Sequence, residues 1–351
     1  MRTEIAELGE FGLIDRLTGE ITPVNNTTVR GPGDDAAVMD FVGGRSDNDN
    51  GGPGGDYVLL SSDMMLEGVD FDLTYFPMRH LGYKAVTVGA SDILAMNGLP
   101  TQITLSLGVS AKLSVEDLEE FYAGARRACS ELGCDIAGGD TTASVNGLAI
   151  AVSVVGTVPR KRIAYRSGAR ENDLICITRD LGAAYLGLHL LERERRALAD
   201  VANPTPQFEG YEYLLERQLR PRARKDVVDA LAAEGIVPTS MIDISDGLAS
   251  DLLQICRASI CGARVYLDRL PIARESYALA EELHIDPVVA ALNGGGDHEL
   301  LFTVPLSARE RVVGMGVGVE IVGHITAEGT DAALVTPDGS DIPLKAQGFK
   351  D

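Results

Sequence analysis

Six short stretches of this sequence each place an aspartate beside glycine or serine, and most follow a strand-like run. They are Gly33-Asp34-Asp35, Ser61-Ser62-Asp63, Ser91-Asp92, Gly139-Asp140-Thr141, Asp243-Ile244-Ser245-Asp246-Gly247 and Gly296-Asp297. Mg²⁺ prefers oxygen ligands and is usually held by one or two carboxylates together with substrate phosphates. Small neighbouring residues let backbone N–H groups approach phosphate oxygens. The stretches therefore favour a fold that gathers distant loops around a multi-metal polyphosphate site.

Each aspartate also has an ordinary structural explanation. Asp beside Gly is common in plain turns. Ser245-Asp246 could simply be the N-cap of the helix that follows, and Asp92 could lie on a solvated helix face. One aspartate alone identifies no metal site, so only the joint pattern suggests magnesium and phosphate.

The charge of the chain limits its partners. There are 31 Lys and Arg against 52 Asp and Glu in 351 residues, a formal net charge of −21. Duplex nucleic acid and an anionic membrane surface are therefore poor partners, and an anionic ligand would need accompanying cations. The sequence shows neither a long apolar run nor the apolar segment of a signal peptide. The five cysteines form no zinc motif, so we expect reduced, buried thiols in a cytoplasmic protein.

Strand-like and helix-like segments alternate in both halves of the chain, which predicts an α/β or α+β fold. One helix is expected to begin after Ser114, which can cap it, and to end at Gly133. A strand over residues 241–247 is expected to turn sharply into the next helix.

The basic stretch at 159–162 is expected to join two domains, residues 1–160 and residues 161–351. Segment 43–56 is rich in Gly, Asp and Asn, and we expect it to form a mobile surface loop.

Several familiar nucleotide-binding motifs are missing. The sequence has neither a GxxxxGK[ST] loop nor a GxGxxG motif opening a βαβ unit. Arg179-Asp180 lacks the rest of a protein-kinase catalytic loop. A P-loop enzyme is therefore excluded, and the sequence offers no motif of a dinucleotide-binding enzyme or a protein kinase.

Eight motifs in order resemble the thiamine-monophosphate kinase family, part of the superfamily of aminoimidazole ribonucleotide synthetase and selenophosphate synthetase. They are Gly9-Glu10-Phe11, Gly33-Asp34-Asp35-Ala36-Ala37, Ser61-Ser62-Asp63 with Glu67-Gly68, Lys84-Ala85 with Ser91-Asp92, Gly138-Gly139-Asp140-Thr141-Thr142, Arg166-Ser167-Gly168, Asp243-Ile244-Ser245-Asp246-Gly247-Leu248, and Gly294-Gly295 with Asp297 and Glu299-Leu300. The resemblance runs from about residue 7 to residue 349, nearly the whole chain.

The resemblance implies a two-domain PurM-like α/β (α+β) fold and ATP-dependent phosphorylation of thiamine monophosphate to thiamine diphosphate. It also implies a homodimer that joins the N-terminal sheets of two subunits, with ATP and several Mg²⁺ ions bound by the N-terminal domain. The implied metal ligands are Asp35, Ser61, Ser62, Asp63, Asp92, Asp140, Asp243 and Asp246. The implied ATP contacts are Tyr122, Gly139, Asp140, Arg166 and Ser245. Two of these have ordinary alternatives, a core position for Tyr122 and a surface ion pair for Arg166.

The sequence departs from the family pattern at residues that the resemblance assigns to the substrate. The family commonly has His at the position of Asp70 and Glu at the position of Gly296. Either Asp70 or Asp297 could supply the missing charge. Phe349 matches an aromatic residue that stacks on the substrate, although a terminal Phe can equally be a packing plug.

Phosphoryl transfer depends mainly on positioning and charge neutralisation. The implied acceptor is already a nucleophilic phosphate anion, so we predict direct in-line transfer without a general base or a phospho-enzyme. Mg²⁺ ions and Arg166 would relieve the repulsion between the two anions.

Two alternatives remain open at the level of sequence. One is another ATP-dependent enzyme of the superfamily, such as aminoimidazole ribonucleotide synthetase. Selenophosphate synthetase is disfavoured because the first cysteine is Cys129, far from the N-terminal glycine-rich segment. The other alternative is a non-catalytic protein whose acidic loops bind divalent ions.

Overall fold

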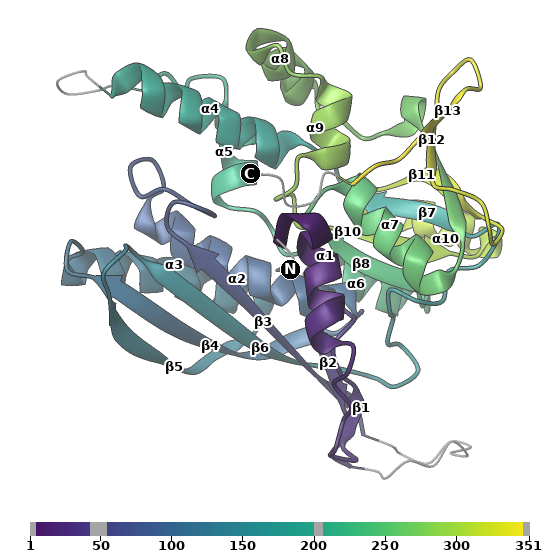
Figure 1. Ribbon diagram of the computed structural model, residues 1–351, viewed down its shortest axis with the longest axis horizontal. Coiled ribbons are helices and arrows are strands. Elements are labelled where there is room, and N and C mark those ends of the chain that lie inside the picture. The colour runs from purple at the N-terminus through teal and green to yellow at the C-terminus, as the bar shows by residue number, and fades with distance from the viewer. Residues whose placement is uncertain (1–4, 43–54, 200–205, 347–351) are drawn as a thin grey trace.

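The computed structural model describes residues 5–42, 55–199 and 206–346. These residues form two mainly antiparallel sheets with helices packed against them (Figure 1). One sheet has six strands in the order β1-β2-β3-β6-β4-β5, and the other has seven in the order β13-β12-β9-β11-β7-β10-β8. The predicted two-domain mixed α/β architecture is confirmed.

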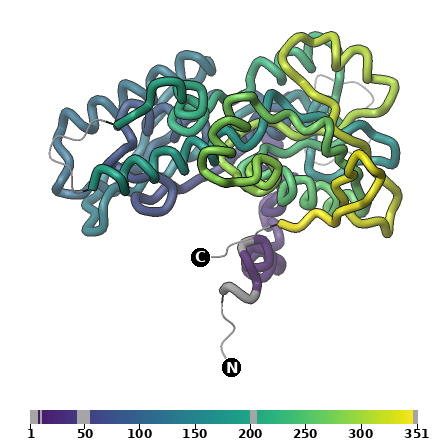
Figure 2. The backbone as a smooth tube through the Cα atoms, turned by 90° about the horizontal axis from the view of Figure 1, so that it is seen from above, coloured from purple at the N-terminus to yellow at the C-terminus, as the bar shows by residue number. Residues whose placement is uncertain are grey.

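The six-stranded sheet comes from the N-terminal half of the chain. Its strands are β1 (Thr28–Arg30), β2 (Ala37–Met39), β3 (Tyr57–Leu66), β4 (Leu99–Ser110), β5 (Asp135–Ser144) and β6 (Ala149–Val158). Helices α2 (Met78–Ala95) and α3 (Val115–Leu132) pack on one face of it (Figure 1). Helix α1 (Ile5–Thr18) projects from the molecule near the boundary between its two halves (Figure 2). Alternate residues of β6 are buried, as expected for a strand with helices on one side only.

The backbones of α2 and α3 approach each other very closely where the helices cross, because a glycine of each helix faces the backbone of the other. A Cβ atom at Gly82 would lie 1.9 Å from the carbonyl oxygen of Phe121, and one at Gly124 would lie 1.8 Å from that of Arg79. Neither position has room for a side chain. This close crossing fixes the orientation of α2, which carries Asp92.

The predicted ends of α3 are confirmed. Ser114 and Asp117 form a reciprocal capping box, in which the Ser114 Oγ accepts from the Asp117 N–H at 3.2 Å. Gly133 ends the helix in the left-handed conformation with φ of 76°.

The seven-stranded sheet comes from the C-terminal half. Its strands are β7 (Leu174–Thr178), β8 (Ser240–Ile244), β9 (Gly262–Tyr266), β10 (Glu299–Val304), β11 (Val319–Thr326), β12 (Ala333–Val335) and β13 (Asp341–Pro343). The helices are α4 (Ala183–Leu198), α5 (Glu212–Leu219), α6 (Lys225–Ala233), α7 (Leu248–Ser259), α8 (Arg274–Leu283), α9 (Pro287–Asn293) and α10 (Arg309–Gly314), with short 3₁₀ turns η1 (Leu267–Arg269) and η2 (Leu306–Ala308). The predicted strand–turn–helix at 241–258 is β8 followed by α7.

The two halves lie side by side in Figure 2 and share a packed boundary. Leu94 and Ala95 at the end of α2 are fully buried in one apolar cluster with Met241 and Leu300 of the second sheet. We propose that the domains divide near residue 160, in the connection between β6 and β7. In the described part of the chain, no helix is both long enough and apolar enough to cross a bilayer.

Two of the stretches expected to be loops are strand residues instead. Ser61, Ser62 and Asp63 lie inside β3, which continues to Leu66, and Gly139 and Asp140 lie inside β5. Both strands continue because neighbouring strands satisfy their backbone groups by regular pairing. Most of the expected mobile loop, residues 43–54, lies outside the described residues.

Candidate active site

Three aspartates from distant parts of the chain meet at the boundary between the two sheets. Asp35 precedes β2, Asp92 lies on α2, and Asp243 lies on β8. One carboxylate oxygen from each lies within 4.8 Å of the others. Such a triad of oxygens could hold a divalent cation, because Mg²⁺ and similar ions bind carboxylates at about 2 Å.

Local structure explains how the triad is assembled. Strand β8 is buried along its whole length, so apolar residues such as Ile242 anchor it and Asp243 is held in the interior. Ser91 precedes Asp92 on α2, and its hydroxyl donates to Asp243 Oδ2 at 2.7 Å. This hydrogen bond joins a helix of the first domain to a strand of the second.

A cavity of about 600 Å³ opens beside the triad. Its lining includes many of the residues that the resemblance assigns to metal and ATP, namely Asp35, Ser62, Asp63, Asp92, Arg166, Ser245 and Asp246. One buried oxygen of Asp35 and one of Asp63 accept no hydrogen bond in the described structure. Unsatisfied buried carboxylate oxygens are costly without a ligand, so this donor set fits divalent cations.

The carboxyl groups of this cavity are crowded and poorly hydrated. Burial raises the pKa of Asp35 to about 7, with Arg166 opposing the rise and Asp243 adding to it. Burial and then Asp243 raise the pKa of Asp63 to about 6. Burial, followed by Asp63 and Asp243, raises the pKa of Asp92 well above its usual range. Nearby cations would favour the ionised forms and relieve this repulsion.

Arg166 brings a positive charge to the edge of the acidic cluster. Its Nε and Nη2 donate to Asp35 Oδ1 at 3.1 and 2.6 Å, and its backbone N–H donates to Asp34 Oδ1 at 3.1 Å. The Arg166 side chain is only one-fifth exposed. Arg166 is therefore a partly buried partner of the cluster and not an isolated surface residue.

Ser61, Ser245 and Asp246 have distinct surroundings. The Ser61 hydroxyl donates to the carbonyl of Gly89, so this side chain already has a partner. Ser245 and Asp246 line the cavity just before α7. The N-cap of α7 is Gly247, so Asp246 is not the cap.

Three predicted residues lie away from the triad within one chain. Tyr122 lines a shallow pocket on the outside of α3. Gly139 and Asp140 lie on β5, an edge strand of the sheet. Gly139 has a structural reason to be glycine, since a Cβ there would lie 1.9 Å from the carbonyl oxygen of Leu105 on β4.

The separation of Asp140 from β3 follows from strand register. Asp140 pairs with Ser106, Ser106 pairs with Ala151, and Ala151 pairs with Met64, the neighbour of Asp63. Three steps between strands correspond to roughly 14 Å. One chain alone does not bring Asp140 to Asp63.

Among the residues that the resemblance assigns to the acceptor, Gly296 lies beside the cavity, because its backbone N–H donates to the carbonyl oxygen of Ser245 at 2.7 Å. Asp70 is exposed, and its Oδ2 accepts from the backbone N–H of Leu66 at 2.7 Å. Gly296 has φ of +74°, and a Cβ there would meet nothing closer than 3.8 Å. Asp297 is buried and already accepts from the backbone N–H groups of Gly182 and Ala184. Phe349 lies outside the described residues.

Sequence reasoning missed two buried residues close to the triad. His298 is 7% exposed, and its Nδ1 lies 3.6 Å from Asp243 Oδ2. Asp251 on α7 is 2% exposed and accepts from the backbone N–H of Asp246. His298 directly follows the Gly296-Asp297 stretch in the sequence, and this position next to a candidate aspartate could have identified it as a site residue. Asp251 looked like one more polar position on an amphipathic helix.

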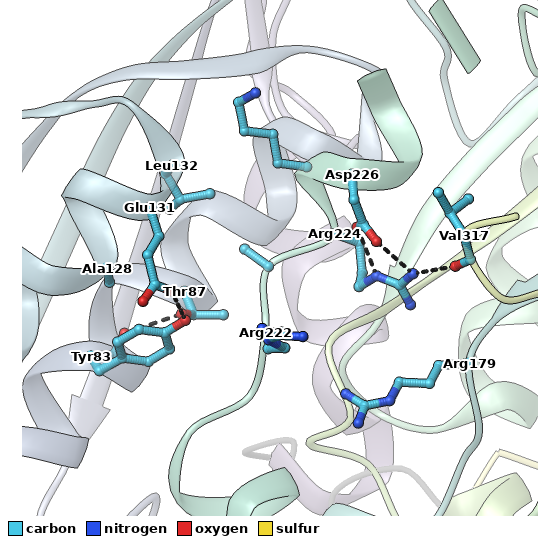
Figure 3. A pocket seen from close by; sticks show the side chains of 12 residues that line it. Tyr83, Thr87, Ala128, Glu131, Leu132, Arg179, Arg222, Arg224, Asp226 and Val317 are labelled. Carbon is cyan, nitrogen blue, oxygen red and sulfur yellow. Dashed lines mark hydrogen bonds and ion pairs between the residues drawn. The ribbon is translucent and has the colours of Figure 1, made fainter. Parts of the chain in front are cut away.

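A second cavity of about 640 Å³ lies between α2, α3 and the chain leading into α6 (Figure 3). It is lined by Tyr83, Arg179, Arg222 and Arg224 among others. Arg224 bonds Asp226 and the carbonyl of Val317 there (Figure 3). Its cationic lining differs from the acidic triad.

Comparisons with known proteins agree with this geometry. Residues 33–158 match the family model "AIR synthase related protein, N-terminal domain", and residues 180–335 match its C-terminal counterpart. The chain is 33% identical to the thiamine-monophosphate kinase of Escherichia coli (strain K12), over 97% of both proteins. It is 32% identical to that of Aquifex aeolicus, over 86% of this chain and 87% of the relative. A solved structure, AaThiL complexed with AMPPCP and TMP, matches all of both chains with a TM-score of 0.82 at 30% identity.

The two matched domains, over residues 33–158 and 180–335, show that the chain is an AIR synthase related protein. Within that class, the relatives that are 32% and 33% identical over most of the chain are both thiamine-monophosphate kinases. The chain belongs to the thiamine-monophosphate kinase family.

Proposed function

We propose that this protein transfers the γ-phosphoryl group of ATP to the phosphate of thiamine monophosphate, forming thiamine diphosphate and ADP. The observation that carries the proposal is the convergence of Asp35, Asp92 and Asp243 across the domain boundary, beside a cavity with unsatisfied carboxylate oxygens. The relatives named above and the solved complex with AMPPCP and TMP support the two substrates.

We propose that Mg²⁺ is bound by the carboxylates of the cavity. Its ligands would come from Asp35, Asp92 and Asp243, with Asp63, Asp246 and Ser62 at the cavity wall. When bound, Mg²⁺ neutralises the phosphate oxygens on which charge develops during transfer. Arg166 is placed to add a further positive charge, because its guanidinium already faces Asp35.

The acceptor phosphate is an anion at neutral pH and needs no activation by a general base. The protein therefore contributes position and charge, as is usual for phosphoryl transfer. The cavity walls come from both domains, so they can hold donor and acceptor in line while limiting access of water.

We propose that the active unit is a homodimer. The face of the six-stranded sheet opposite α2 and α3 exposes apolar side chains of β3, with Met64 66% and Leu60 40% exposed. Strand β5 at its edge is exposed along almost its entire length. Bare apolar sheet faces and long edge strands normally acquire a partner. A second copy on this face would meet Ser62 and Met64, and would bring its own Asp140 toward the segment of β3 that carries Asp63.

The proposal is tested by incubating the protein with Mg-ATP and thiamine monophosphate and separating the products by chromatography. We expect thiamine diphosphate and ADP in equal amounts, and no diphosphate from free thiamine. Asp92→Asn is expected to abolish turnover, whereas Asp56→Asn, at an exposed position before β3, serves as the matched control. ADP release without thiamine diphosphate would refute the assignment of the acceptor.

A further inference from the structure

Lys84 on α2 is a buried cation without an anionic partner. Its residue exposure is 6%, and its Nζ donates to the backbone oxygen and Oε1 of Gln218 at 3.1 and 3.3 Å. In the described part of the chain, no carboxylate oxygen lies within 4.0 Å of this nitrogen. An ammonium group has three donors, so one remains for a ligand.

The other buried cations of the described residues are paired. Arg217 bonds Glu299 at 2.5 Å and Asp297 at 3.3 Å. Arg224 bonds Glu299 and Asp226 at 2.5 and 3.0 Å. Removing an ammonium group from water is costly unless an opposite charge compensates. The missing charge at Lys84 therefore points to an anion that arrives with a ligand.

Gln218, which accepts from Lys84, also borders Gly296, a position that the resemblance assigns to the acceptor. A Cβ atom added at Gly296 would find Gln218 Oε1 and Ala184 at 3.8 Å and nothing nearer. Lys84 lies over the Phe76 ring, 5.6 Å from its centroid. Asp70 and Asp297 favour its charged form from beyond ion-pair distance, although burial prevails and lowers the pKa of Lys84 to about 8.

Helix geometry connects Lys84 to the metal-binding end of the site. Lys84 and Ser91 are seven residues apart, so they lie on the same side of α2 and are separated by roughly 10 Å of helical rise. Lys84 faces α5 through Gln218, and Ser91 faces β8 through Asp243. One side of α2 thus runs from an unpaired cation to the acidic triad, along the domain boundary.

We propose that Lys84 binds the phosphate group of the acceptor and acquires its counter-charge only when the acceptor is present. This inference rests on the proposed function, because it assigns a residue to the acceptor in that reaction. Lys84 forms and breaks no covalent bond. Its ammonium offsets part of the repulsion between the acceptor phosphate and the triphosphate of ATP, and it fixes the acceptor beside the N-terminal half of α2.

The test compares the binding of thiamine monophosphate and of free thiamine by calorimetry, in the presence of Mg²⁺ and AMPPCP. Lys84→Met keeps the length of the side chain, Lys84→Arg keeps the charge, and Lys112→Met, at an exposed position, is the control. In the wild type we expect thiamine monophosphate to bind more tightly than thiamine. Lys84→Met should remove most of that difference, a loss of roughly 10- to 100-fold in the affinity for thiamine monophosphate.

Two further readouts separate ligand binding from a structural role. AMPPCP affinity should stay within about twofold of wild type in Lys84→Met. Near pH 8.5, thiamine monophosphate should bind with uptake of a fraction of a proton in the wild type and not in Lys84→Met, because the phosphate restores the charge of Lys84.

Equal losses of affinity for thiamine and thiamine monophosphate would overturn the inference, as would an unchanged preference for the phosphate form. Absence of acceptor binding to the wild type would also overturn it. Because binding is measured without turnover, a wild type that binds thiamine monophosphate but makes no diphosphate would count against the proposed function and not against Lys84.

Discussion

The position of Asp140 leads to a prediction about shared active sites. Within one chain, Asp140 on β5 lies three strands away from the neighbour of Asp63 on β3. At 4.7–4.9 Å per strand this is roughly 14 Å, too far for both carboxylates to serve one phosphate group. If both are needed, one must come from a second subunit.

Two inactive variants should therefore restore activity when mixed. Asp63→Asn and Asp140→Asn should each lower kcat by roughly 100-fold or more, because each removes a metal ligand worth several kcal/mol in the transition state. In a heterodimer of the two variants, one site carries both substitutions and the other carries neither. Random exchange of subunits makes half of the dimers mixed, so the mixture should recover about a quarter of wild-type specific activity.

The assay is thiamine diphosphate formation after the two purified variants are unfolded and refolded together. Each variant refolded alone is the control for spontaneous recovery, and sedimentation confirms that the mixture is dimeric. A mixture no more active than the separate variants would show that both aspartates act within one chain, and would refute the shared site. A wild type that is fully active as a monomer would refute it as well.

Three further predictions concern single residues. Asp35→Asn should lower turnover by roughly 100-fold without lowering the melting temperature, because it removes one of several crowded like charges; a protein melting several degrees lower would indicate a structural role. Folding lowers the pKa of Lys84 from the ordinary 10.5 to about 8. Between pH 8 and pH 10.5 the unfolded chain therefore binds more protons at Lys84 than the folded chain does. Its contribution to stability therefore rises with pH, and denaturant unfolding at pH 7.5 and 9.5 should show a gain of about 2 kcal/mol in the wild type that Lys84→Met lacks. Gly82→Ala, which places a Cβ 1.9 Å from the Phe121 carbonyl oxygen, should lower the free energy of unfolding by about 2 kcal/mol or more, whereas Gly314→Ala, with open space around it, should change it little.

Much of the fold could be predicted from local sequence patterns. The capping box at Ser114 and the left-handed Gly133 are short-range features, so the ends of α3 were predictable. Strand β8 and the helix after it follow from a short apolar run and a turn at Gly247. The strand character of Ser62 and Asp140 was not predictable locally, because it depends on pairing with strands more than 30 residues away.

The acidic chemistry of the candidate site could be predicted from the sequence, but only some of the residues that meet there could be. Repeated aspartates beside small residues predicted an acidic cluster, and three of them meet as one triad. The spread of Asp140 and Tyr122 away from it was not predictable, because it depends on the order of strands in the sheet. The lack of an anionic partner at Lys84 was not predictable either, because a lysine in a helix is normally solvated and its burial here depends on distant packing, including Gln218 of α5 and the Phe76 ring.

The central claim is that aspartates from both domains bind Mg²⁺ ions that hold a nucleoside triphosphate. It is tested most directly by the melting temperature of the wild type and of Asp92→Asn with Mg²⁺ alone, AMPPCP alone, and both together. We predict a large upward shift in the wild type only when both are present, as for a ligand that binds the folded state, and none in Asp92→Asn. Full stabilisation by Mg²⁺ alone, with nothing added by AMPPCP, would identify a structural ion site and contradict the account.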